Sequence, residues 1–281
     1  MNRDEIEGFR KTIYNAYEKM GRSFPWRENI YGYYAEWGIL VSEIMLQQTQ
    51  TSRVVPFWEQ WMEKWPTPAH MKKASLQEVL QAWSGLGYNR RARSLLECAE
   101  IITRKFGGRV PDTPAVLENL PGIGAYTAGA IACFAYNYPA VLIETNIRAV
   151  MLHFFFENEQ DVKDRQIMPL LDLVLDRTNP RVWNWAMMDY GAELKKFTPN
   201  PNHRSAHYTQ QTKFEGSIRQ IRGSLIRQLS AKGAATAEEL RAGLDVRAEK
   251  EDFYKALEAL GKELMVAERS GVYSIKPIGK G

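Results

Sequence analysis

The stretch Leu120-Pro121-Gly122-Ile123-Gly124 decides the fold, because it joins two segments with helical periodicity. The first segment covers residues 114–119 and the second covers residues 127–136. Gly122 and Gly124 have no Cβ, so another backbone can approach this turn closely. The helix that follows begins with backbone N–H groups that have no helical partner and with the positive end of its dipole. The stretch therefore predicts a site for one phosphate group.

A Gly-x-Gly turn by itself is weak evidence, because most such turns only reverse the chain. A helix, the turn Pro121-Gly122-Ile123-Gly124 and a second helix together form the helix–hairpin–helix pattern, which is more specific. This pattern positions DNA through its backbone without reading its sequence. We therefore expect DNA contacts from this segment, namely from Leu120, Gly122, Ile123, Gly124, Tyr126 and Thr127.

Helical periodicity continues on both sides of the hairpin through the first two hundred residues. Apolar spacing predicts a first helix over residues 6–17, which Phe24-Pro25-Trp26-Arg27 ends. A central helix over residues 33–50 is apolar nearly all round. Further helices are expected over residues 54–65, 75–84, 90–106, 114–119, 127–136, 145–156, 164–175 and 182–195. Alternating strand patterns are scarce before residue 260, so the fold class is all-α.

The chain changes in character after residue 195. Residues 196–216 contain prolines and polar residues but no aliphatic run, which is typical of a linker or an ordered loop. From Lys195 to Arg222 there are six cations and one anion, so this stretch carries +5 while the whole chain carries +4. It is either a solvated basic connector or a phosphate contact.

Residues 217–281 predict a smaller unit of three helices followed by a hairpin. Thr236-Ala237-Glu238-Glu239 fits a capping box that opens the second helix. Residues 265–275 predict the hairpin. This order is that of a winged helix, which binds DNA through its third helix or mediates protein contacts. The sequence leaves both roles open.

Composition excludes several classes of protein. With 281 residues, 44% of them hydrophobic and 25% charged, the chain is an ordinary globular protein. Cys98 and Cys133 are its only cysteines, too few for a structural zinc, an iron–sulfur cluster or a disulfide framework, which favours a reducing cytoplasm. The most apolar stretch, residues 128–143, is interrupted by Asn137 and Pro139 and is too short to span a membrane. The charged N-terminus does not resemble a signal peptide.

A carboxylate interrupts the apolar central helix. Glu43 lies within Gly38-Ile39-Leu40-Val41-Ser42-Glu43-Ile44-Met45-Leu46, where burial would raise its pKa and let it hold a proton near neutrality. Cleavage of a base from deoxyribose needs such a proton donor. The alternative is a salt-bridged core glutamate. The polar run Gln47-Gln48-Thr49-Gln50, whose amides suit contacts to a base edge, favours the catalytic interpretation.

A second carboxylate, Glu144, follows the apolar run of residues 140–143 and precedes an expected helix start. It is either an acidic residue favoured by the helix dipole or a partner that faces Glu43 across a cleft. Two carboxylates in unlike environments can divide the work between an acid and a charge stabiliser.

Several blocks, in this order along the chain, resemble the helix–hairpin–helix base-excision DNA glycosylases, and most nearly the adenine-DNA glycosylase (MutY-like) family. The resemblance that these blocks carry extends over about two thirds of the chain. The blocks are residues 24–27, 42–50, 83–88, 91–93, 120–131 and 183–192.

The resemblance implies a bilobal all-α fold that binds double-stranded DNA across its cleft with the target base flipped out. A six-helix lobe would cover about residues 30–135, and the second lobe residues 1–29 plus 136–195. Glu43 matches the catalytic acid that protonates adenine, and Gln48 and Tyr88 match residues placed in and beside the opened base stack. The remaining expected DNA contacts are Gln47, Thr49 and Arg91.

The sequence departs from the family pattern at its metal site and its C-terminal domain. The cysteine cluster would fall on Lys195, Asn202, Ser205 and Gln211, so the resemblance implies that the iron–sulfur cluster is absent. The small unit after residue 217 does not resemble the family's larger guanine-reading domain, which puts recognition of 8-oxoguanine in doubt.

Two single positions also depart from relatives. Glu144 stands where the family has aspartate, which keeps the charge but moves the carboxylate. Tyr126 stands where bifunctional relatives have a Schiff-base lysine, so β-elimination is not expected. Catalysis would therefore rest on Glu43, Glu144 and Tyr126.

The leading hypothesis is a monofunctional glycosylase that removes adenine mispaired with guanine or oxidised guanine. One alternative is a thymine or uracil glycosylase that acts at G mismatches, because the guanine-reading domain is missing. A second alternative is a non-catalytic DNA-binding relative, supported only by Glu144. We expect a monomer without metal or cofactor, in the cytoplasm with the nucleoid and not in a membrane.

Overall fold

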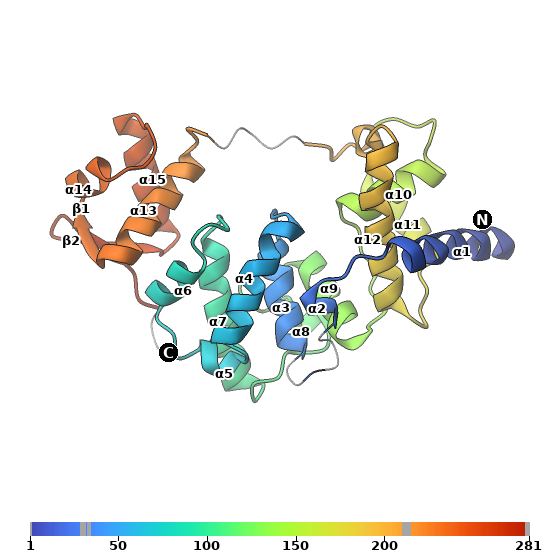
Figure 1. Cartoon of the computed structure of the whole chain (residues 1–281), viewed down its shortest axis with the longest axis horizontal. Helices are drawn as coiled ribbons and strands as arrows, with labels where there is room; N and C mark the ends of the chain where they lie inside the picture. Colours follow the sequence, from blue (N-terminus) through green and yellow to red (C-terminus); the bar gives the residue numbers. More distant parts are fainter. Residues whose placement is uncertain (1, 29–31, 33–34, 210–214, 279–281) are drawn as a thin grey trace. The chain divides into compact units, whose positions relative to one another are not determined.

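The computed structural model describes residues 2–28, 32, 35–209 and 215–278 of the chain (Figure 1). The chain divides into two compact units. The first contains Met1–Ile39, Pro111–Asn119 and Ile123–Gln210, and the second contains Leu40–Val110, Leu120–Gly122 and Gln211–Gly281. No helix in the described part of the chain has both the length and the hydropathy of a membrane span. The domain bounds expected from the sequence stay a prediction.

The first unit is helical, as the sequence predicts. Its helices are α1 (Arg3–Met20), α2 (Pro25–Glu28), α8 (Pro114–Leu117), α9 (Ala125–Tyr136), α10 (Thr145–Phe155), α11 (Asp164–Val174), α12 (Pro180–Phe197) and the 3₁₀ helix η1 (Pro201–Arg204). The sequence predicts only a break at residues 24–27, whereas Pro25–Glu28 forms one helical turn. Proline suits this position because a first-turn N–H has no helical partner to lose.

Helices α10 and α12 pack closely because α12 carries a glycine where they meet. A Cβ placed on Gly191 would lie 2.1 Å from the carbonyl oxygen of Asn146, so no side chain fits there. Asn146 belongs to the first turn of α10, directly after Glu144 and Thr145. The close approach therefore fixes the end of the helix at which Glu144 stands.

A buried carboxylate on α12 binds the segment that follows α1. Asp189 is only 4% exposed and accepts from the backbone N–H of Arg22 at 2.7 Å. The guanidinium groups of Arg22 and Arg27 donate to it at distances of 2.7 to 3.0 Å. Arg27 also lies over the rings of Phe24 and Trp185. These partners offset the cost of removing the carboxylate from water.

Replacing Asp189 with alanine should lower the free energy of unfolding by about 3–5 kcal/mol, because Arg27 would be left buried without its anion. Asp172→Ala is the matched control, since Asp172 pairs with Arg177 where both side chains are more than half exposed. The control substitution should lower the free energy of unfolding by less than about 1 kcal/mol. Urea unfolding of both variants measures the difference, and equal losses would contradict the assignment.

The second unit begins within α3 (Ala35–Leu46) and continues through α4 (Thr51–Lys64), α5 (Pro68–Met71), α6 (Leu76–Ala82) and α7 (Arg90–Lys105). Trp61 and Trp83 are fully enclosed in its core, with their ring centres 5.4 Å apart. The predicted central helix is confirmed over Ala35–Leu46. Residues 33 and 34, which were expected to open it, lie outside the described residues.

The C-terminal part of the second unit has the predicted order of three helices and a hairpin. It contains α13 (Ile218–Lys232), β1 (Ala234–Thr236), α14 (Ala237–Ala242), α15 (Lys250–Lys262), β2 (Val266–Arg269) and β3 (Val272–Ile275). Ser270 and Gly271 turn the hairpin, both with positive φ, as a tight two-residue turn requires. Strand β1, which pairs antiparallel with β3, is not among the elements expected from the sequence.

Helix α13 packs on α6 within this unit. The side chains of Gln77 and Gln81 both donate to the carbonyl oxygen of Ser230, at 2.8 and 2.6 Å. Arg93 of α7 donates to the carbonyl oxygen of Leu264. These contacts hold α13 beside residues 84–88, the loop that follows α6.

Candidate DNA interface and active site

The hairpin has the geometry that its glycines predict. Gly122 has φ 75°, and a Cβ there would lie 2.8 Å from the Cβ of Ser94 on α7. Leu120 and Ile123 are buried and anchor the turn. Gly124 is the N-cap residue of α9 and has no side chain to accept from the first-turn N–H groups. An anion can take that place, so the end of α9 suits a phosphate.

Tyr126 and Thr127 lie in the first turn of α9 but differ in exposure. Tyr126 is 38% exposed, whereas Thr127 is buried. The tyrosine is thus accessible to a ligand at this end of the helix. The threonine packs inside, so any part it takes in DNA binding runs through its backbone.

Two loops of the second unit present residues in a strained conformation. Gln48 has φ 56° and Tyr88 has φ 48°, in the left-handed region that non-glycine residues rarely adopt. Each such residue costs on the order of 1–3 kcal/mol and persists only where the surrounding structure enforces it. Both side chains are exposed. Strain of this kind is typical of residues held ready for a ligand.

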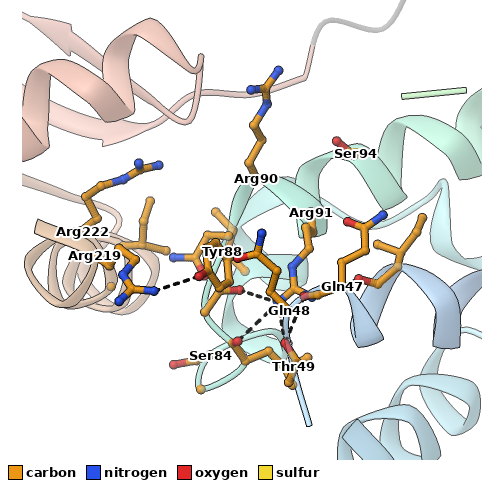
Figure 2. Close-up of a pocket in the computed structure, with 18 of the residues that line it drawn as sticks. Gln47, Gln48, Thr49, Ser84, Tyr88, Arg90, Arg91, Ser94, Arg219 and Arg222 are labelled. Carbon is orange, nitrogen blue, oxygen red and sulfur yellow. Dashed lines mark hydrogen bonds between the residues drawn. The ribbon is translucent and has the colours of Figure 1, made fainter. Parts of the chain in front are cut away.

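A cavity of about 830 Å³ opens between these two loops and helix α13 (Figure 2). Gln47, Gln48 and Thr49 line it from one loop, and Ser84 and Tyr88 from the other. Further lining residues are arginines: Arg53, Arg90, Arg91, Arg219, Arg222 and Arg227. Among the described residues that line it, Glu263 is the only acidic one, so the cavity favours an anionic or electron-rich ligand.

Arg91 holds the two loops together. Its guanidinium donates to the carbonyl oxygens of Ile44, Met45 and Gln47, at the end of α3, at 2.6 to 3.0 Å. It also donates to the hydroxyl of Thr49 and to the carbonyl oxygens that precede Tyr88, at 3.1 to 3.3 Å. Burial lowers the pKa of Arg91 to about 10, and the side chain is 8% exposed. The structure places Arg91 inside as the support of both loops, and the DNA contact expected from the sequence stays a prediction.

Glu43 lies on α3, one turn before the first of these loops. It is half-buried, between Ser42 and Ile44, which are fully buried. Gln47, four residues further along, donates from its side chain to the carbonyl oxygen of Gly122 at 3.2 Å. The helix that bears Glu43 is therefore joined to the hairpin, and Glu43 itself is partly exposed.

Glu144 is the N-cap residue of α10. Its Oε1 accepts from the backbone N–H groups of Asn146 and Ile147, both at 2.8 Å, and its Oε2 from the side chain of Asn146 at 3.1 Å. Burial raises the pKa of Glu144, while these N–H groups and the charges of Lys195 and Arg148 act in the opposite direction. Glu144 belongs to the first unit and Glu43 to the second, so their pairing stays a prediction.

The model of the HhH-GPD superfamily of base excision DNA repair proteins matches residues 41–181. The chain belongs to this superfamily. The matched segment contains the second half of α3 with Glu43, the hairpin and the helix that Glu144 caps. The resemblance seen in the sequence motifs is thereby confirmed.

Several curated relatives are named adenine DNA glycosylase. The adenine DNA glycosylase of Mycobacterium tuberculosis is 36% identical over 255 residues, which cover 82% of this chain and 80% of that protein. That of Mycolicibacterium smegmatis is 39% identical and covers 82% of each chain. The adenine DNA glycosylase of Homo sapiens is 36% identical over 68% of this chain and 36% of its own.

Solved structures confirm the fold expected of an HhH-GPD protein. A thermostable thymine-DNA glycosylase superposes with a TM-score of 0.59 at 26% identity, over 67% of this chain and 87% of that one. An endonuclease III trapped in a covalent intermediate with DNA gives a TM-score of 0.57 at 18% identity, over 71% and 94%. The similarity to the endonuclease III structure, at 18% identity, is evidence for the fold alone.

The positions where the family pattern places cluster cysteines do not fit an iron–sulfur cluster. Lys195, Asn202 and Ser205 offer amine, amide and hydroxyl groups, while such clusters bind thiolates. Gln211, like the linker cation Lys213, lies outside the described residues. In the described part of the chain, no three His, Cys, Asp or Glu side chains group as metal ligands would.

Hydrogen bonds and a backbone bridge fix the segment that follows α12. Asn202 is 3% exposed, and its side-chain amide donates to the carbonyl oxygen of Thr145 at 3.1 Å. Arg204 donates to the carbonyl oxygen of Leu152 at 2.8 Å, and Val162 pairs with Ser205 through a backbone bridge. Thr145 directly follows Glu144, so these bonds fasten the segment to the capped end of α10.

Replacing Asn202 with alanine should lower the free energy of unfolding by about 1–3 kcal/mol, because the carbonyl of Thr145 would lose a buried donor. Asn119→Ala is the matched control. Its amide also donates to a backbone carbonyl, that of Ala115 at 2.7 Å, but it is exposed. Thermal unfolding of both variants measures the difference, and an unchanged melting temperature for Asn202→Ala would contradict the fastening role.

Proposed function

We propose that the chain is a monofunctional DNA glycosylase that hydrolyses the N-glycosidic bond of adenine mispaired with guanine or oxidised guanine. The observation that carries the proposal is its similarity to proteins named adenine DNA glycosylase, at 36 to 39% identity over 82% of the chain. The partly accessible carboxylate on α3 and the arginine-lined cavity of the second unit support the proposal from the geometry.

In this proposal Glu43 is the acid. It gives its proton to a ring nitrogen of adenine, so that the bond from the base to C1′ of the sugar breaks and adenine leaves as a neutral molecule. The sugar becomes oxocarbenium-like, and water adds to C1′ and gives a proton to the Glu43 carboxylate, which restores the acid. The position of Glu43 on a buried helix suits the task, since the helix holds the carboxyl group in place while one side stays accessible.

Glu144 stabilises the positive charge that develops on the sugar. Two backbone N–H groups and the first turn of α10 fix its carboxylate, so it needs little reorganisation during the reaction. Burial raises the pKa of Glu144, and the same N–H groups oppose this shift by favouring the ionised form that this role requires. The carboxylate of Glu144 thus caps α10 and also stabilises the positive charge of the sugar.

The enzyme cleaves the bond between the base and the sugar and leaves the DNA strand intact. Tyr126 stands at the exposed start of α9 in place of a lysine, and a phenol forms no imine with the sugar. It acts on double-stranded DNA as a monomer, without an iron–sulfur cluster or other cofactor, in the cytoplasm with the nucleoid. The thymine or uracil alternative keeps one support, the similarity in fold to a thymine-DNA glycosylase.

A panel of duplexes that contain A·G, A·8-oxoguanine, T·G or U·G tests the substrate. After alkali treatment, cleavage is expected at adenine in the first two. Without alkali the strands should stay intact, and borohydride should trap no covalent complex. Cleavage only at pyrimidines would contradict the adenine proposal, and no cleavage at all would support the non-catalytic alternative.

Glu43→Gln should reduce the single-turnover rate of adenine excision by about 100-fold or more, because the amide cannot donate the proton. Affinity for the same duplex should change little, since the substitution keeps the size of the side chain. Glu36→Gln is the matched control, because it removes a carboxylate from the first turn of the same helix, and it should leave the rate unchanged. An active Glu43→Gln variant would refute the acid role.

Glu144→Gln should abolish excision while the melting temperature changes little, since the amide oxygen can still accept from the N–H groups that cap α10. Glu144→Asp, which restores the residue of the family pattern, should retain or raise the rate. Stability and rate are measured on the same preparations. If the aspartate variant is inactive although folded, Glu144 does not serve as the family carboxylate.

A further inference from the structure

A lysine of the first unit lies beside the capped end of α10. Lys195 belongs to the last turn of α12, four residues after Gly191. Residues four apart lie on the same face of a helix, and at Gly191 this face contacts the backbone of Asn146 in the first turn of α10. The lysine therefore extends from α12 on the side where Glu144 caps α10.

Lys195 and Glu144 interact through their charges. Burial raises the pKa of Glu144, and the charge of Lys195 acts against that shift. Burial lowers the pKa of Lys195, and the charge of Glu144 acts against that shift in turn. Lys195 is half-buried and forms no hydrogen bond or close ion pair with any other described residue, so it acts on the carboxylate through space.

Two arginines near this pair already have carboxylate partners. Arg148, one turn into α10, donates to both oxygens of Asp164 at 2.8 Å. Arg22, which precedes α2, binds Asp189. The negative charge of each partner offsets the field of its arginine at longer range. Lys195 has no such partner in the part of the chain that the structure describes, so its charge remains to act on the carboxylate that caps α10.

We propose that Lys195 acts through Glu144, by supplying the charge that keeps this carboxylate ionised while the sugar becomes positive. The inference rests on the proposed function. A protonated carboxyl group carries no charge and stabilises the sugar far less, so a carboxylate that burial disfavours needs a cation nearby. The ammonium also repels the sugar, but Lys195 is partly open to water, which weakens that repulsion. The chain thus places an electrostatic contact at a position where the family pattern has a cluster cysteine.

Single-turnover excision of adenine as a function of pH tests the proposal on Lys195→Met, which keeps an unbranched side chain and removes its charge. Glu144 must be ionised and sets the acid limb of the profile, whereas Glu43 must hold its proton and sets the basic limb. Removing the cation raises the pKa of Glu144, so the acid limb should move to higher pH by about one pH unit, with a rate about 10-fold lower on that limb. The loss should shrink as the pH rises, because Glu144 then ionises without help. His207, which acts on Asp164, titrates in both proteins alike.

Two further variants separate charge from packing. Lys195→Arg keeps the charge and should restore the wild-type acid limb. Lys196→Met is the matched control, because it removes the next cation along α12, whose mostly exposed side chain pairs with Glu193. It should leave the acid limb in place. Melting temperatures of the three variants check that each is folded.

A ¹³C NMR titration of the glutamate carboxyl groups reads the ionisation of Glu144 without DNA, and the signal is assigned by its loss in Glu144→Gln. In Lys195→Met this signal should titrate at higher pH than in the wild-type protein. An unmoved signal would overturn the proposal. A wild-type protein that excises no adenine would refute the proposed function and still leave this titration readable, so either idea can fail alone.

The pH profile also distinguishes the proposal from a contact between Lys195 and the DNA backbone. A loss of rate that is equal at every pH, together with weaker binding of the duplex, would overturn the proposal and make Lys195 a phosphate contact. A loss that Lys195→Arg does not restore, although that variant is folded, would overturn it as well.

Discussion

The buried guanidinium of Arg91 is the contact on which the two strained loops of the second unit depend. One cation joins the end of the helix that bears Glu43 to the loop that bears Tyr88. Its burial lowers its pKa to about 10, and the oxygen acceptors around it offset the cost of that burial. Because it fixes both loops, Gln48 and Tyr88 can be held in a conformation that neither would adopt in a free loop.

In the first unit, packing and hydrogen bonds fix the position of Glu144. Close contact at Gly191 fixes the first turn of α10, and Asn202 holds the carbonyl of Thr145 beside it. The carboxylate is therefore positioned by backbone N–H groups whose own places are fixed by packing and by neutral hydrogen bonds. A polar segment after α12 makes these contacts at positions where the family pattern would put metal-bound cysteines.

The features that could be predicted from the sequence are those that neighbouring residues determine. The helices around the hairpin follow from apolar spacing and glycines, and the capping box at Thr236 formed as predicted. The role of Arg91 could not be predicted, because the acceptors at residues 44–47 lie more than forty positions away. The bond from Arg219 to Tyr88 joins residues 131 positions apart, so no local pattern could indicate the cavity. The turn α2 and strand β1 are too short to show a period.

In the proposed reaction, adenine leaves because an acid protonates its ring. The most direct measurement is single-turnover excision from duplexes in which the target opposite guanine is adenine, 7-deazaadenine or 3-deazaadenine. Each analogue replaces one ring nitrogen with a carbon that accepts no proton. The account predicts that adenine is released and that at least one analogue resists release while its duplex is still bound. Release of both analogues as fast as adenine would contradict it.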